Sequence, residues 1–325
     1  MKAIVFTRYG PPERLELMDV PRPEPEAREV LVRVHASSIN SWDWEYLNGT
    51  PFINRLFFGL FKPRHGKQRL GADIAGTVEA VGRDVTRFRP GDEVFGDLWD
   101  KWGGFAEYAC TNETAIERKP GNVTFEQAAA VPQAGVLALL GIRKVEQINP
   151  GDAVLINGAG GGVGTFAIQL AKLTDADVTG VDAAHKLEVV RNVGADHIID
   201  YTQQDFTSTG ETYDLIIDCQ GTRPMSSIKR ALKPGGTYAV VGAQMKRVRQ
   251  MWFASALSNI TGETRRLRLV AEGPNKGLAD LASLLEAGQL VPVIDKTYRL
   301  EQVPEALAYF GSGQHKGKIA ITIRQ

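Results

Sequence analysis

The first 120 residues alternate apolar and polar positions in the way that short β-strands do. Residues 29–36 show this alternation, which is the period of a strand with one buried face, and residues 74–81 continue it. Residues 89–92 carry a Pro-Gly-Asp turn that leads into the apolar run 93–95. Short strands punctuated by Gly and Pro at this spacing predict a compact, barrel-like β domain.

A different rhythm begins near residue 124, where helical periods alternate with short apolar strands. The pattern predicts strands at 153–157, 177–181, 197–199, 214–218 and 237–241, and helices at 163–173 and 185–193. Strand–helix alternation of this length is typical of an α/β domain with a parallel, doubly wound sheet. The last strand-like segment, 318–323, returns in the simplest assembly to the first domain.

The change of pattern sets the domain boundaries that we expect. A β-rich domain begins at 1–124, a dinucleotide-binding domain is inserted at 125–266, and the chain returns to the first domain at 267–325. With 325 residues the chain is long enough for two domains, because single cores stop growing at roughly 250–300 residues.

Charge and cysteine content narrow the range of partners and compartments. Lys plus Arg equals Asp plus Glu at 38 each, so neither nucleic acid nor contact with an anionic membrane is expected. Two cysteines, Cys110 and Cys219, fit a reducing compartment, and the charged N-terminus does not resemble a signal peptide. The apolar stretch 128–142 is too short to span a bilayer. We therefore expect a cytoplasmic protein.

A glycine-rich loop carries the strongest chemical signal. It follows the predicted strand 153–157 and opens the predicted helix, where glycines allow a sharp turn and close approach to a pyrophosphate. The residues expected to bind the diphosphate are Ala159, Gly160, Gly161, Gly162, Val163 and Gly164. Asp182, 21 residues after Gly161, ends the second strand, where an acidic residue can bind the ribose hydroxyls.

Asp182 also bears on the choice between NAD and NADP. Its carboxylate accepts hydrogen bonds from a free ribose 2′-hydroxyl but repels a 2′-phosphate, which favours NADH. Lys186, four residues further on, could instead pair with such a phosphate. Both cofactors stay open, with NADH favoured.

An ordered series of motifs adds to these signals: residues 40–43 with Gly49, 71–78, 90–94, 103–108, 161–164, 193–201, 232–237 and 317–319. With this series the chain resembles the medium-chain dehydrogenase/reductase superfamily over essentially its whole length. Within it, the chain is most similar to the zinc-independent quinone oxidoreductases, the zeta-crystallin-like branch. The resemblance implies a Rossmann domain inserted in a GroES-like, β-rich catalytic domain, and a homodimer.

The same resemblance indicates that no catalytic zinc is bound. Zinc-dependent relatives place ligands at the positions of Asn40, Ala72-Asp73 and Gln133. Here these positions hold two amides, a methyl group and a single carboxylate. Catalytic zinc needs three strong ligands, so the expected cofactor is the nicotinamide dinucleotide alone.

Without a metal, a quinone or an α,β-unsaturated carbonyl (enone) is the expected substrate, small and apolar, because its negative charge spreads as hydride arrives. The catalytic candidates are Asn40, as donor to the developing oxyanion, Asp43, which either takes part or braces the loop, and Tyr46. Tyr46 is one position away from where many relatives carry a Tyr, since Glu45 stands there. Further cofactor contacts implied are Gln133, Tyr201 and Gly242.

Two other activities remain compatible with the residues. One is a zinc-independent alcohol or aldehyde dehydrogenase, and the other is a dinucleotide-binding protein that catalyses nothing. The apolar segment 50–61 also stays open, as a lid over a hydrophobic acceptor, as packing between domains, or as a peripheral membrane contact.

Overall fold

The computed structural model describes residues 1–64, 66, 68–99, 101–143, 148–242, 249–251, 264–270 and 273–323. The chain forms two compact units. Unit 1 consists of Met1–Val136 and Pro274–Gln325, and unit 2 consists of Leu137–Gly273. Unit 2 is therefore an insertion in the chain of unit 1, as the sequence pattern predicts.

Unit 1 is built on a seven-stranded sheet with the order β14-β15-β3-β4-β5-β7, in which β6 also pairs with β3. Its strands are β1 (Lys2–Val5), β2 (Glu16–Asp19), β3 (Glu29–Ser38), β4 (Asp73–Val81), β5 (Glu93–Asp97), β6 (Tyr108–Asn112), β7 (Ile116–Arg118), β14 (Ile294–Arg299) and β15 (Lys318–Thr322). Its helices are α1 (Ser41–Asn48), α2 (Asn54–Phe58), α3 (Phe125–Ala129), α9 (Leu278–Glu286) and α10 (Val303–Gly311). β1 and β2 form a separate antiparallel pair.

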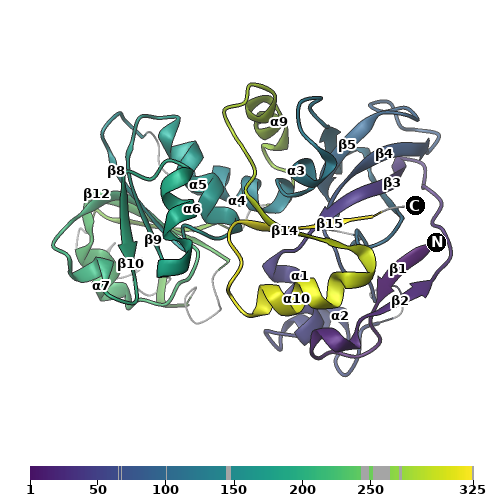
Figure 1. Cartoon of the computed structure of the whole chain (residues 1–325), viewed down its shortest axis with the longest axis horizontal. Helices are drawn as coiled ribbons and strands as arrows, with labels where there is room; N and C mark the ends of the chain where they lie inside the picture. The colour runs from purple at the N-terminus through teal and green to yellow at the C-terminus, as the bar shows by residue number, and fades with distance from the viewer. Residues whose placement is uncertain are drawn as a thin grey trace. The chain divides into compact units, whose positions relative to one another are not determined.

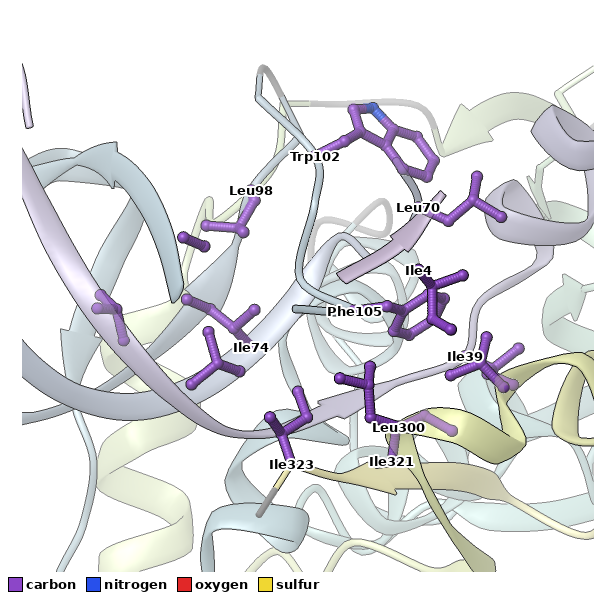
Figure 2. Close-up of a cluster of buried hydrophobic side chains, with 14 of the residues drawn as sticks. Ile4, Ile39, Leu70, Ile74, Leu98, Trp102, Phe105, Leu300, Ile321 and Ile323 are labelled. Carbon is purple, nitrogen blue, oxygen red and sulfur yellow. The ribbon is translucent and has the colours of Figure 1, made fainter. Parts of the chain in front are cut away.

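One hydrophobic core joins the two ends of the chain in unit 1. Figure 2 shows Ile4 from the first strand near Phe105, with Ile321 from the last strand in the same cluster. β15 pairs antiparallel with β3, with Ala320 opposite Ser38. The alternating patterns at the two ends of the sequence thus supply opposite parts of one core, which is why the inserted segment does not interrupt it.

Unit 2 is a parallel six-stranded sheet with the order β10-β9-β8-β11-β12-β13. Its strands are β8 (Ala153–Asn157), β9 (Asp177–Asp182), β10 (His197–Asp200), β11 (Tyr213–Asp218), β12 (Leu232–Val241) and β13 (Arg266–Val270). Its helices are α5 (Gly162–Lys172), α6 (Leu187–Asn192) and α7 (Met225–Arg230). This is the doubly wound order 3-2-1-4-5-6, which places a ligand crevice where the order reverses, beside β8.

Right-handed crossovers distribute the helices over this sheet. In Figure 1, α5 and α6 lie to one side of the strands of unit 2, and α7 lies to the other. The predicted helix at 185–193 is instead a 3₁₀ turn, Ala184–Lys186, followed by α6.

The boundaries between the two units along the sequence differ from those that we expected. The divisions fall after Val136 and after Gly273, whereas the pattern change suggested 124 and 266. The difference at the first boundary arises because α3 packs on β3 and β4 of unit 1, although it belongs to the helical part of the sequence. α4 (Pro132–Ile142) contains the division.

Among the residues that the structure describes, no helix is both long enough and apolar enough to cross a bilayer.

The close pairing of β3 and β4 predicts an intolerance to added volume at Gly76. A Cβ at this position would lie 2.1 Å from the carbonyl oxygen of Arg33, so the backbone of one strand has to move. We expect Gly76→Ala to lower the free energy of unfolding by about 1–3 kcal/mol, as measured by urea denaturation. The control is Gly121→Ala, where a Cβ meets nothing within 4 Å. Equal effects of the two substitutions would contradict this packing argument.

Candidate cofactor and substrate site

At Gly160 and Gly164 the glycine-rich loop of unit 2 leaves no space for a Cβ. β8 ends at Asn157, Gly158 turns with φ of +85°, and Gly161 caps the N-terminus of α5. A Cβ on Gly164 would lie 2.2 Å from the carbonyl oxygen of Gly158 and 2.6 Å from Cα of Ala159. The first turn of the helix therefore packs directly on the loop.

The outer side of the same loop remains accessible. Ala159 and Gly164 are buried, whereas Gly161, Gly162 and Val163 keep partial exposure. The amides at a helix N-terminus lack partners within the helix, and the helix dipole adds partial positive charge there. The geometry fits a diphosphate, which is the group that the sequence motif predicts for this loop.

Asp182 is held against the loop by two backbone amides. One carboxylate oxygen accepts a hydrogen bond from the Gly160 N–H at 2.8 Å, and the other accepts from the Ala183 N–H at 2.8 Å. The side chain is almost fully buried. Each oxygen keeps a second lone pair, so the fixed carboxylate can still accept a ribose hydroxyl.

The other predicted cofactor residues of unit 2 surround this point. A Cβ on Gly160 would lie 2.7 Å from Cβ of Lys186, so the Lys186 side chain packs across the glycine. Tyr201 donates its backbone N–H to the Asp182 carbonyl at 3.1 Å, and its side chain is half exposed. Gly242 follows β12 with φ of +62° and open space where a side chain would stand.

A buried carboxylate that the sequence analysis did not single out fixes the ends of three strands. Asp218 accepts hydrogen bonds from the Asn157 amide at 2.8 Å and from the Tyr238 hydroxyl at 2.7 Å. The backbone N–H groups of Gln220 and Gly221 add two more, each at 2.9 Å. Asp218 thereby ties β8, β11 and β12 together at the edge from which the glycine-rich loop emerges.

In unit 1, Asn40 and Asp43 lie together at the start of α1. Asn40 is the N-cap residue, and its backbone N–H donates to the Asp43 carboxylate at 2.9 Å. The other oxygen of Asp43 accepts from the Gly71 N–H at 2.8 Å. Both oxygens are therefore used to hold the backbone, which is the geometry of a brace between α1 and the segment just before β4.

The side-chain amide of Asn40 is fixed from both ends. Its nitrogen donates to the Asp73 carboxylate at 2.9 Å, and its oxygen accepts a hydrogen bond from the Lys318 ammonium. Lys318 also donates to the Ile39 carbonyl at 3.1 Å and lies 3.6 Å from Asp73. Two ionic partners of opposite sign leave the amide a single orientation.

Asp73 connects this group to Gln133. One of its oxygens accepts from the Ser38 hydroxyl at 3.0 Å, and the other accepts from the Gln133 backbone N–H at 3.1 Å. The structure thus brings together Asn40, Asp43 and Gln133, which the sequence analysis proposed. It adds Ser38, Asp73 and Lys318.

Three carboxyl groups share the single ammonium in this buried cluster. Asp43 and Asp73 have no exposed surface, and Asp97 and Lys318 have 3% each. Burial raises the pKa of Asp43 to about 7 and raises the pKa of Asp97 well above its ordinary value. Burial likewise raises the pKa of Asp73, although Lys318 opposes the rise, and it lowers the pKa of Lys318. Burial without enough counter-charge therefore favours retained protons here.

The amides are the accessible part of this cluster. Asn40 is 5% exposed and Gln133 is 8% exposed, so both are less deeply buried than the charged groups. One oxygen of Asp97 lacks a hydrogen-bond partner, which is consistent with a carboxyl group that is not ionised.

The residues at the expected zinc positions do not fit a zinc ion. Asn40 and Gln133 are amides, and Asp73 already contacts a lysine ammonium that would repel a divalent cation. Among the residues that the structure describes, no three His, Cys, Asp or Glu side chains are grouped to hold a metal ion.

Tyr46 lies in a different environment from Asn40 and Asp43. Its ring packs in the aromatic core, 5.4 Å from the Phe6 ring centroid and 4.2 Å from that of Phe58. It is 3% exposed, and burial raises its pKa. The structure therefore places this candidate proton donor among apolar rings.

Lys318 and Asp97 are the site residues that the sequence analysis missed. Lys318 is the first residue of an otherwise apolar strand. A lysine at the start of a buried apolar strand indicates that its ammonium has a buried partner, and this was the signal in the sequence that could have identified it. Asp97 ends β5 with no comparable pattern around it.

Comparison with known proteins agrees with this architecture. A family model described as alcohol dehydrogenase GroES-like domain matches residues 26–139, and one described as zinc-binding dehydrogenase matches residues 193–321.

Full-length relatives share the same arrangement. The chain is 31% identical to "Quinone-oxidoreductase QR1, chloroplastic" of Triphysaria versicolor, covering 99% of this chain and 98% of the relative. It is 33% identical to "NAD(P)H oxidoreductase RTN4IP1, mitochondrial" of Bos taurus, covering 99% and 89%. The solved structure of the quinone oxidoreductase from Coxiella burnetii matches with a TM-score of 0.88 and 31% identity, over 100% of this chain and 99% of that one. The chain therefore belongs to the medium-chain dehydrogenase/reductase superfamily, in its quinone oxidoreductase branch.

Proposed function

We propose that this protein is an NAD(P)H-dependent oxidoreductase that reduces a small apolar quinone or enone without a metal. The observation that carries the proposal is the loop at 158–164: its partly exposed residues 161–163 lie at the N-terminus of α5, and the Gly160 amide fixes the carboxylate of Asp182 beside them, in a chain of this family. A bound nicotinamide supplies the hydride. The residues of the chain bind and orient.

Asn40 is proposed as the donor to the substrate oxygen. One hydrogen of its amide nitrogen is donated to Asp73, and the second is the one that we assign to the oxygen on which charge develops. Because Lys318 and Asp73 hold the amide in place, little reorganisation is needed during the reaction. Asp43 braces the loop, and Gln133 and Gly242 are proposed to border the nicotinamide.

The cofactor is proposed to be NADH in preference to NADPH. Asp182 is held at the loop, where its charge would oppose a 2′-phosphate. The Lys186 side chain packs across Gly160, and within the described part of the chain it forms no ion pair with Asp182. Tyr201 is proposed to border the adenosine end.

We also propose a reducing compartment and a homodimer, from the cysteines and from the edges of the unit 2 sheet. Cys110 and Cys219 are both free, which suits a reducing compartment such as the cytoplasm. Among the described strands, β10 and β13 are the two outer strands of the unit 2 sheet, and a homodimer paired edge to edge through this sheet fits the family pattern.

The first test measures oxidation of NADH and NADPH with a panel of quinones, enones, aldehydes and simple alcohols as the second substrate. We expect turnover with quinones or enones, and we expect Asn40→Ala to lower kcat by roughly 10- to 100-fold because a positioned donor is lost. The dissociation constant for the coenzyme should stay near its wild-type value. The control is Asn48→Ala, at the other end of α1, where the side chain donates a hydrogen bond to the Trp44 carbonyl. An unchanged kcat in Asn40→Ala rejects the assigned role, and activity with alcohols alone rejects the reductase.

The second test addresses the coenzyme. Asp182→Ser should weaken the binding of NADH and improve the binding of NADPH, because a charge-assisted contact to the 2′-hydroxyl is removed. The ratio of the kcat/KM values for the two coenzymes should shift by roughly 10- to 100-fold. Asp177→Ser, at the opposite end of the same strand, is the matched control. If both variants keep the wild-type ratio, Asp182 does not select the coenzyme.

The third test measures how the stability of the protein depends on the protonation of Asp43. Between the unfolded value of 3.8 and the folded pKa of about 7, Asp43 is protonated in the folded protein but ionised in the unfolded chain. The free energy of unfolding should therefore fall by about 2 kcal/mol from pH 5 to pH 8, measured by urea denaturation. Asp43→Asn should be less stable but should show a flatter pH dependence. Asp84→Asn, an exposed carboxyl group, should keep the wild-type slope, and a steeper slope in Asp43→Asn would contradict the assignment.

A further inference from the structure

The exposed apolar side chains of this protein gather on one short segment. Eleven large hydrophobic residues are exposed in the described chain, and five of them lie within ten residues: Phe52, Ile53, Leu56, Leu60 and Phe61. We call these five the apolar patch. Phe61 is 87% exposed, more than any other large hydrophobic residue described. Single exposed apolar residues are ordinary, but a contiguous group of this kind marks an interaction surface.

Other side chains of the same segment anchor it to the body of unit 1. Arg55 donates to the carbonyls of Gly49 and Asn48 at 2.9 and 3.2 Å, and the Tyr9 hydroxyl donates to the Gly59 carbonyl at 2.8 Å. Phe58 packs against the ring of Tyr46 in the aromatic core. The outward direction of the apolar patch is therefore set by a segment whose inner face is already bonded.

Four cations lie beside one end of the apolar patch, where Leu60 and Phe61 are. A groove of about 690 Å³ beside it is lined by Leu60 and Phe61 and by Arg8, Arg14, Lys62 and Arg64. All four cations are exposed, and within the described residues none of them forms an ion pair. The sequence from 46 to 72 contains no Asp or Glu at all, and Glu13 is the acidic neighbour of Arg14. The whole chain has zero net charge, and the sequence analysis therefore expected no membrane contact. That average does not reflect the local excess of positive charge in this segment.

We propose that the apolar patch and these four cations dock the protein onto the surface of a bilayer that contains anionic lipids. Apolar side chains enter the boundary between headgroups and acyl chains, while Arg and Lys side chains remain at the level of the lipid phosphates. Charge complementarity selects this occupant, because exposed apolar side chains with cations beside them and no acidic residue between 46 and 72 match a negative surface without needing defined partner groups. The attachment is peripheral, since α2 has five residues. It does not depend on the proposed redox function.

The experiment is flotation of the full chain with vesicles of phosphatidylcholine alone or with about a third of phosphatidylglycerol, at low and at physiological salt. We expect binding to the anionic vesicles, weakened by salt, and little binding to the neutral ones. Leu56→Ser with Phe61→Ser, and separately Lys62→Glu with Arg64→Glu, should each lower the partition coefficient by about tenfold or more. The matched controls are Val291→Ser, at an apolar residue that is 54% exposed, and Arg83→Glu, at an exposed cation elsewhere; both should bind as the wild type does.

Two results would overturn the proposal. One is equal partition of the wild type and both double variants on anionic vesicles, including the case in which none of them binds. The other is a loss of dimer in the double variants, measured by sedimentation velocity, without a change in vesicle binding, because the patch would then be covered by a second copy of the chain. Coenzyme binding by each variant, measured by NADH fluorescence, reports that the fold is intact and keeps this outcome separate from the test of the redox function.

Discussion

The geometry of the buried polar cluster in unit 1 depends on the contacts of the Lys318 ammonium. It lies in the last strand, yet its hydrogen bonds go to Ile39 and Asn40 near the end of the first long strand, 278 residues earlier in the case of Asn40. A buried ammonium is unfavourable unless it is paired and hydrogen-bonded, so β15 can pair with β3 only in the register that brings Lys318 to Asn40 and Asp73. The same contact sets the orientation of the Asn40 amide.

The two units differ in how they hold the groups proposed to bind the coenzyme and the substrate. In unit 2 the means is the absence of side chains: Gly164 lets the helix lie against the loop, and Gly160 leaves space for Lys186 while donating its N–H to Asp182. In unit 1 it is a dense set of charged side chains, which hold one neutral amide. A diphosphate needs many amides at short distance, whereas a developing charge on one oxygen needs a single donor that does not move.

Short-range patterns predicted the fold well because each of them reports local burial. The alternation at 29–36 became the centre of β3, the glycine-rich motif became the turn into α5, and the strand-like end of the chain returned to unit 1 as β15. The expectation that no catalytic zinc is bound also followed from the residue types at single positions, because Asn40 and Gln133 carry amides. What the sequence did not reveal depends on contacts between distant segments. Nothing near Lys318 indicates that its partner is Asp73, and nothing near Phe125 shows that α3 packs on the β-rich unit.

The buried charges also explain which acceptors suit the site. Asn40 offers an oxygen only a neutral N–H donor, and the nearest full positive charge, on Lys318, is already shared with Asp73 and lies close to two further carboxyl groups. The field behind the amide is therefore weak, and retained protons on Asp43 and Asp97 keep it from becoming repulsive. A simple aldehyde concentrates its charge on one oxygen as hydride arrives and would need a stronger counter-charge, such as a metal ion. A quinone or an enone distributes that charge over a conjugated system, and a single fixed amide donor, the role proposed for Asn40, suits such an acceptor.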